Sequence, residues 1–247
     1  MTHIIILAAG KGTRMKSDLP KVLHQVKGTP IIQRLLTNIQ PVCETPTLIV
    51  GHKAEDVIST TGNKYHYVIQ TEQRGTGHAV MMAKEDLEGK DYKTVVVLLG
   101  DHPLVSARTV QDLVITHEKE GAAVTLATAV VPNYEDKHSV FLNYGRVIRD
   151  TDGTVHKIVE FKDASEEERM LKEVNPSYYC FDAKWLWENI SKLGSMNASN
   201  EFYLTDMIQL ARDQDRKVVA SVIENIDECL GINTPEQLKM VEDTLVE

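Results

Sequence analysis

Short runs of β-branched residues alternate with amphipathic segments through the first part of the chain, and this alternation constrains the fold more than any other feature. One amphipathic segment has apolar residues at Ile32, Leu35, Leu36 and Ile39, the spacing of one helix face. The β-branched runs lack polar alternation, which is typical of strands covered on both faces. We therefore predict a Rossmann-like α/β fold with a mixed, mostly parallel sheet and helices on both faces. The runs are Ile4–Leu7, Thr47–Val50, Tyr67–Ile69 and Thr94–Leu99, and a second helical segment spans Thr76–Leu87.

The pattern changes after Pro132, where the expected strands become short and polar. We predict one domain over residues 1–247, with a core at 1–131, a small antiparallel lobe at 132–182, and a segment at 183–247 that completes the core. The expected lobe elements are strands at Arg146–Arg149, Val155–Glu160 and Tyr178–Phe181 and a charged helix at Ser165–Lys172.

Positive charge is concentrated near the N-terminus of an otherwise acidic chain. The net charge is −9, yet residues Met1–Gly28 carry five basic residues against one acidic residue. An acidic chain argues against broad nucleic-acid binding, whereas a basic, glycine-containing stretch predicts a site for a small anion. The cysteines form no C-x-x-C pair, and no segment has the pattern of a signal peptide or a membrane span. We expect a soluble, cytoplasmic protein with no nucleic-acid or membrane partner.

The segment Leu7–Lys21 is the strongest functional signal. A buried strand leads directly into a loop with Gly10 and Gly12, and glycines let backbone N–H groups approach a phosphate closely. Arg14 and Lys21 would add cations for charge that grows during a reaction. Neither a dinucleotide-binding fingerprint nor a Walker A sequence fits, the former because Met15 stands where a small residue is needed. The alternative is an ordinary strand-to-loop turn with solvated lysines.

Two more polar segments follow predicted strands, where ligands bind in open α/β sheets. Asp101 comes just after Thr94–Leu99, and a lone carboxylate beside phosphates is a natural Mg²⁺ ligand; the alternative is a turn or helix cap. Gln70 follows Tyr67–Ile69, and its amide suits the edge of a pyrimidine, whereas the turn around Gly75 could equally be simple helix initiation.

These segments resemble the signature of the sugar-1-phosphate nucleotidyltransferases. The chain as a whole, from about Ile4 to the last helix, is similar to the uridyltransferase domain of the bifunctional bacterial enzymes that make UDP-N-acetylglucosamine. The matching segments are Leu7–Lys21, Gln70–Ala79, Leu99–Leu104, Tyr144–Arg146, Ile158–Asp163, Glu201–Asp206 and Gly231–Asn233. We find no hexapeptide repeat of a left-handed β-helix, so we expect no acetyltransferase part in this chain.

The resemblance implies a fold of the nucleotide-diphospho-sugar transferase type and a complete set of site residues. Arg14 and Lys21 would act on the phosphates, and Mg²⁺ would lie on Asp101 and Asn233. Spacing alone could not choose Asn233 over Asp227 or Glu228. The uridine of UTP would contact Leu7, Ala8, Ala9, Gly10, Lys21, Gln70, Gly75 and Thr76, and a sugar-1-phosphate would contact Leu99, Gly100, Gly145, Glu160 and Asn175 in a sugar-binding lobe.

The expected reaction is attack of N-acetylglucosamine-1-phosphate on the α-phosphorus of UTP. The sequence departs from the family at Leu99, where tyrosine is usual, and at Asn175-Pro-Ser177, where Asn-Thr-Gly is usual. Both departures affect the sugar more than the reaction, so glucose-1-phosphate or another nucleotide stays open as an alternative. A nucleotide-sugar sensor and a dinucleotide-dependent oxidoreductase are the other hypotheses. We expect the histidines, His102 among them, to be turn or surface residues, and the oligomeric state stays open.

Overall fold

The main sheet has parallel strands on either side of its first strand. Residues 1–245 are described by a computed structural model. β1 (Thr2–Ala8) pairs in parallel with β4 (Thr47–Val50) and with β6 (Thr94–Leu99), and β4 pairs in parallel with β5 (His66–Ile69). The predicted α/β class with a mixed, mostly parallel sheet is confirmed. Because these strands are parallel, their carboxyl ends meet at one edge of the sheet.

The rest of the sheet includes one strand that we expected in the lobe from the sequence. β11 (Tyr179–Asp182) runs antiparallel between β6 and β7 (Val124–Val130), in the middle of the main sheet rather than among the lobe strands. Its first three residues are buried, which a central position between two covered faces requires. β12 (Val218–Val222) pairs in parallel with β7, so the last quarter of the chain returns to the core.

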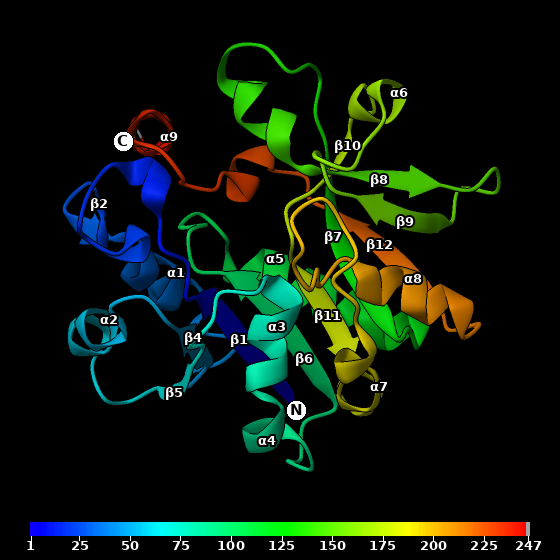
Figure 1. Ribbon diagram of the computed structural model, residues 1–247, viewed down its shortest axis with the longest axis horizontal. Helices are drawn as coiled ribbons and strands as arrows, with labels where there is room; N and C mark the ends of the chain where they lie inside the picture. Colours follow the sequence, from blue (N-terminus) through cyan, green and yellow to red (C-terminus); the bar gives the residue numbers. More distant parts are fainter. Residues whose placement is uncertain (246–247) are drawn as a thin grey trace.

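Alternate side chains of the strands pack into two separate cores. Along β1, Ile4 and Ile6 enter one core and Ile5 enters the other, and none of the three is exposed. Burying each such side chain contributes roughly 1.5–3 kcal/mol. The first core is covered by α1 (Ile31–Ile39), α2 (Ala54–Thr61) and α5 (Ala107–Glu120), and the second by α3 (Thr76–Met82), α4 (Lys84–Leu87), α7 (Ala183–Asn189) and α8 (Asp206–Asp213) (Figure 1).

Local sequence signals set the ends of several helices. The segment predicted as one helix at Thr76–Leu87 forms two helices that meet at Ala83. Ser106 accepts a hydrogen bond from the Thr109 amide at the start of α5, and α9 (Pro235–Thr244) begins at a proline behind a Thr234 cap. None of the helices in residues 1–245 is long and apolar enough to cross a bilayer.

The lobe is an antiparallel sheet that continues from the end of β7. β10 (Glu173–Asn175) pairs with β7 and with β8 (Gly145–Arg149), and β8 pairs with β9 (Val155–Val159). Figure 1 shows the lobe at the opposite end of the molecule from the N-terminus, on the side where β1 ends. The remaining short elements are β2 (Gln25–Val26), β3 (Thr29–Pro30), α6 (Glu166–Arg169), and the 3-10 turns η1 (Thr13–Met15), η2 (Lys21–Leu23), η3 (Asp136–Asn143), η4 (Ile190–Lys192) and η5 (Ile226–Cys229).

Candidate active site

The loop after β1 folds tightly over Lys21, and one glycine makes this possible. Gly12 has φ +62°, and a Cβ added there would lie 2.6 Å from Lys21 Cβ. Any side chain at this position would therefore be strained and would push the loop off Lys21. Gly10 has no atom within 4 Å of an added Cβ, so the backbone there faces open space in which a ligand can approach.

Four polar side chains converge where this loop meets the end of β6. Lys21 Nζ donates to Asp101 Oδ2 and, at 2.7 Å, to Asn233 Oδ1. Arg14 Nη2 donates to the same Asn233 oxygen at 2.9 Å. The structure thus brings together residues from three distant parts of the sequence. Two cations and two oxygen ligands at one point are suited to binding phosphates and a divalent cation.

Asp101 is ionised at this point because of its cationic neighbour. Asp101 is only 8% exposed, and burial alone would raise the pKa of its carboxyl. The charge and hydrogen bond of Lys21 outweigh burial and hold the pKa of Asp101 below its ordinary value. The site therefore offers a carboxylate whose charge is balanced by a nearby, movable ammonium group.

The expected nucleotide residues line one cavity of about 290 Å³ at the carboxyl ends of β1, β5 and β6. Gln70 is 3% exposed; its Nε2 donates to the Gly75 carbonyl and contacts His78 Nδ1 at 2.9 Å. Gly75 has φ +103°, and an added Cβ would lie 2.5 Å from the Phe202 carbonyl. The lining includes Leu7, Ala8, Ala9, Gly10, Lys21, Gln70, Gly75 and Thr76, together with Leu99 and Asp101.

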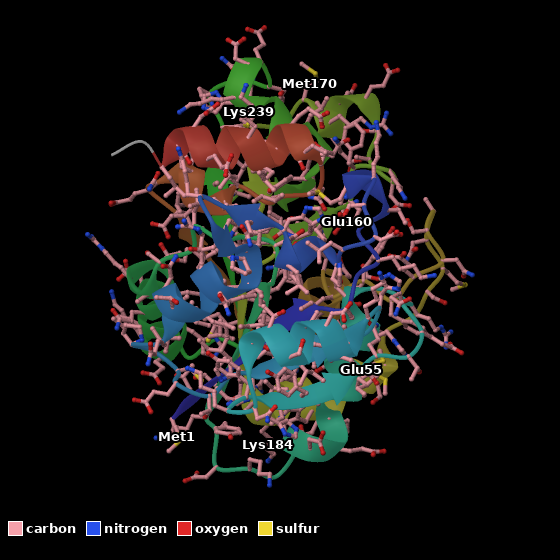
Figure 2. All side chains as sticks on the ribbon, turned by 90° about the vertical axis from the view of Figure 1, so that its left-hand side faces the viewer. Met1, Glu55, Glu160, Met170, Lys184 and Lys239 are labelled. Atoms are coloured by element: carbon pink, nitrogen blue, oxygen red, sulfur yellow. The ribbon has the colours of Figure 1, made fainter. Side chains whose placement is uncertain are left out.

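A second cavity of about 220 Å³ adjoins the first on the lobe side. Four residues line both cavities, so the two share one wall. Glu160 lines only the second cavity, and Figure 2 shows it below Met170 of the lobe. The shared wall consists of Leu7, Thr76, Leu99 and Glu201, and the other polar residues of the second cavity are Ser177, Tyr179, Tyr203 and Thr205.

The Glu160 carboxyl lies in a strongly acidic environment. Its Oε1 accepts a hydrogen bond from the Thr205 hydroxyl at 3.3 Å. Burial, followed by the charges of Asp206, Asp163 and Glu201, raises the pKa of Glu160 to about 7. No lysine or arginine lines this cavity in the described residues. The cavity is therefore suited to a neutral ligand rich in hydroxyl or amide donors, rather than to an anionic sugar ring.

Comparisons with known proteins give the family of the chain. A family model described as the MobA-like NTP transferase domain matches residues 4–187. The chain belongs to this family. The chain is also similar to the bifunctional protein GlmU of Acetivibrio thermocellus. The two are 43% identical over 235 residues, which cover 95% of this chain and 49% of that protein.

A second relative, the bifunctional protein GlmU of Clostridium novyi, is 44% identical over 243 residues, covering 98% of this chain and 51% of the relative. The chain spans about half the length of the curated relatives it matches. A crystal structure described as a glucose-1-phosphate thymidylyltransferase from Bacillus anthracis matches with a TM-score of 0.75 at 18% identity, over 99% of this chain and 95% of that chain. This last likeness supports the fold.

Three expected sugar residues of this NTP transferase stand behind the second cavity rather than in its lining. Gly100 packs against the end of β1. Gly145 is buried, and a Cβ added there would lie 2.9 Å from Ile158 Cγ2 and 3.5 Å from Glu160 Oε2. Asn175 is 3% exposed and uses its side chain internally: Nδ2 donates to Tyr179 Oη at 2.6 Å, and Oδ1 accepts from the Ser177 amide at 3.0 Å. Asn175 therefore holds Ser177 and Tyr179, which do line the cavity.

Sequence reasoning misjudged His102 and left the partner of Asp101 open. His102 closes a turn through its amide and the Leu99 carbonyl, but it is 3% exposed, so the expectation of a surface residue is wrong; its ring packs directly behind Asp101. Of the three residues left open, only Asn233 accepts hydrogen bonds from Lys21 and Arg14. Asp227 instead forms an ion pair with Lys137. Glu228 accepts hydrogen bonds from the Ser106 amide and the Thr109 hydroxyl. No local pattern could have found either feature, because both depend on contacts between distant segments.

The oxygen pair of Asp101 and Asn233 is the site where this NTP transferase could hold a metal ion. Residues 1–245 contain no group of three or more His, Cys, Asp or Glu side chains that could hold one by themselves. A cation bound to only two protein oxygens needs further ligands from phosphate and water. Mg²⁺ meets this description, since it commonly keeps several waters and substrate phosphates in its coordination shell.

Proposed function

We propose that the chain transfers the uridylyl group of UTP to N-acetylglucosamine-1-phosphate, giving UDP-N-acetylglucosamine and pyrophosphate. The observation that carries this proposal is the shared wall between the two cavities, with Lys21, Asp101 and Asn233 at the edge of the first. A nucleotide in one cavity and a sugar in the other would meet beside this charged cluster. The similarity to the GlmU proteins supports the choice of substrates.

The chemistry needs positioning and charge neutralisation rather than a protein nucleophile. A phosphate oxygen of the sugar phosphate forms a bond to the α-phosphorus of UTP, and the bond from that phosphorus to the bridging oxygen of the β-phosphate breaks, releasing pyrophosphate. A phosphate monoester is largely dianionic at pH 7, so the attacking oxygen requires no general base. Holding the two reactants in line converts a bimolecular step into an effectively unimolecular one.

Lys21 and Arg14 would stabilise the charge that develops on the triphosphate. Their contacts with Asn233, at 2.7 and 2.9 Å, keep both cations at the phosphate end of the nucleotide cavity. Asp101 and Asn233 would hold Mg²⁺, which when bound neutralises phosphate charge. Because Lys21 now lies on both oxygens, its ammonium would move from them to the phosphates when the metal binds.

The amide of Gln70 would recognise the base, and the carboxylate of Glu160 would recognise the sugar. In the described residues, Gln70 Nε2 is occupied by Gly75 and His78, while its Oε1 accepts no hydrogen bond and is open to a donor such as the N3–H of uracil. Glu160, Ser177 and Tyr179 would contact the sugar from the lobe side. Because the three cysteines are unpaired in the described residues, we place this activity in the cytoplasm.

The test is release of pyrophosphate from UTP and Mg²⁺, measured in parallel with N-acetylglucosamine-1-phosphate and with glucose-1-phosphate. We expect release with the first sugar phosphate and little with the second. Release with glucose-1-phosphate alone would keep the reaction and replace the sugar. Tight binding of UDP-sugar without release from either would instead indicate a nucleotide-sugar sensor.

A further inference from the structure

The segment that carries Asn233 is far in sequence from Asp101 and lies between η5 and α9. The position of this segment decides whether Asn233 Oδ1 lies opposite Asp101 Oδ2, with Lys21 Nζ between them. One backbone bond ties it to the β6 end directly, from the Ile232 amide to the Asp101 carbonyl at 2.9 Å. The other contacts that fix the segment come from side chains that the reaction does not use.

Two tyrosine hydroxyls hold the backbone of this segment. Tyr178 Oη donates to the Glu228 carbonyl at 2.8 Å. Tyr144 Oη donates to the Cys229 carbonyl at 2.7 Å and accepts from the Gly231 amide at 3.0 Å. Tyr178 is 1% exposed, and buried hydrogen bonds of this kind are costly to remove because the partner left behind is unsatisfied.

His102 lies between Tyr178 and Asp101. Its Nδ1 lies 2.5 Å from Tyr178 Oη, and because the single phenol hydrogen is given to Glu228, the imidazole donates this bond. Its Nε2 lies 3.6 Å from Asp101 Oδ1. The imidazole therefore hydrogen-bonds the tyrosine that holds the opposite segment and packs against the Asp101 carboxylate without a hydrogen bond to it.

The segment also packs directly against this ring. A Cβ added at Gly231 would lie 2.4 Å from His102 Nε2 and 3.1 Å from Tyr144 Oη. Glycine is needed here for space alone, because the backbone at this residue is not in the left-handed region. Any displacement of the ring or the hydroxyl would therefore shift the backbone two residues before Asn233.

We propose that His102, Tyr144 and Tyr178 are positioning residues that hold Asn233 opposite Asp101, so that the two oxygens form a metal site before any ligand binds. This inference rests on the metal site of the proposed function. Partners that orient metal ligands from behind commonly change metal affinity by roughly ten- to a hundredfold when they are removed.

The test compares Tyr178→Phe and Tyr144→Phe with Tyr67→Phe as a matched control. Tyr67 is partly buried like Tyr144, and its hydroxyl also donates to a backbone carbonyl, that of Gly62, but it lines neither cavity and makes no hydrogen bond to the Asn233 segment. Mn²⁺ alone is titrated against each folded variant, the wild type and Asp101→Ala, with free Mn²⁺ followed by electron paramagnetic resonance. The Mg²⁺ concentration for half-maximal pyrophosphate release and the kcat at saturating Mg²⁺ are measured alongside.

We expect both test variants to bind Mn²⁺ roughly tenfold more weakly than the wild type, with kcat largely recovered at saturating Mg²⁺, while Tyr67→Phe keeps wild-type Mn²⁺ affinity. Gly231→Ala, which removes no hydrogen-bonding group, should show the same defect. Should Tyr178→Phe fail to fold, the less buried Tyr144→Phe decides. Wild-type Mn²⁺ affinity in the folded test variants, or an equal loss in Tyr67→Phe, overturns this inference but leaves the proposed function standing. A wild type that binds no more Mn²⁺ than Asp101→Ala overturns the metal site itself.

Discussion

Replacing Glu160 with glutamine should stabilise the protein at alkaline pH and weaken its use of the sugar. Burial and three neighbouring acidic residues raise the pKa of Glu160 from 4.5 to about 7. This difference corresponds to about 3 kcal/mol of unfavourable free energy for the ionised form. The carboxyl also faces solvent in an open cavity, which screens its charge, so we expect the substitution to recover about 1–2 kcal/mol.

The sign of the pH dependence follows from where the proton resides. Between pH 4.5 and about 7, the folded protein holds a proton on Glu160 that the unfolded chain has lost. The free energy of unfolding therefore falls as pH rises through this window, and the full penalty is present above it. Glutamine has no such penalty, and its Oε1 can still accept the hydrogen bond from Thr205. The two proteins should be equally stable near pH 4 and differ most at pH 8.

Urea denaturation at pH 4.5, 6 and 8 measures this difference. Glu44→Gln serves as the control, since that carboxylate is exposed in the loop before β4 and lines neither cavity. In pyrophosphate-release assays at pH 8, KM for the sugar phosphate should rise roughly tenfold or more, because hydrogen bonds to a charged acceptor contribute about 1.5–3 kcal/mol. A Glu160→Gln protein that is less stable than the wild type at pH 8, or whose gain is the same at every pH, would refute the reasoning.

Three further substitutions test the phosphate end of the site. Asp101→Ala should lower kcat by about a hundredfold or more, and near-normal Mg²⁺-dependent turnover would contradict its assignment as a metal ligand. Lys21→Ala should mainly raise KM for UTP in steady-state assays; an unchanged UTP dependence argues against contact with the phosphates. Gly12→Ala should weaken UTP binding measured by calorimetry, because the added Cβ would lie 2.6 Å from Lys21 Cβ, and wild-type affinity would show that the loop can move without loss.

The parts of the site that follow strands directly could be predicted from sequence. Lys21, Gln70 and Asp101 stand within or just after loops at the carboxyl ends of strands β1, β5 and β6, and parallel strands bring such loops to one edge. The strands themselves are marked by continuous apolar runs, so the class of the fold and the place of the nucleotide cavity follow from local pattern.

The residues on the lobe side and behind the site depend on long-range packing, which local patterns do not encode. β11 is as short as the lobe strands, yet pairing with β6 and β7 places it in the main sheet. Asn175 faces Tyr179 instead of the cavity because of the turn that follows it, where Ser177 has φ +66°. The burial of His102 comes from Tyr178, Tyr144 and Gly231, which lie 42 or more residues away along the chain.

The central claim is that the two adjoining cavities bring a nucleotide and a sugar phosphate together for transfer at the α-phosphorus. The most direct measurement is ³¹P NMR of the wild-type protein with UTP, N-acetylglucosamine-1-phosphate and Mg²⁺. The account predicts that pyrophosphate and UDP-N-acetylglucosamine appear in equal amounts, and that chelation of Mg²⁺ stops both. Pyrophosphate without nucleotide-sugar, or substrates left unchanged with this and other sugar phosphates, would contradict it.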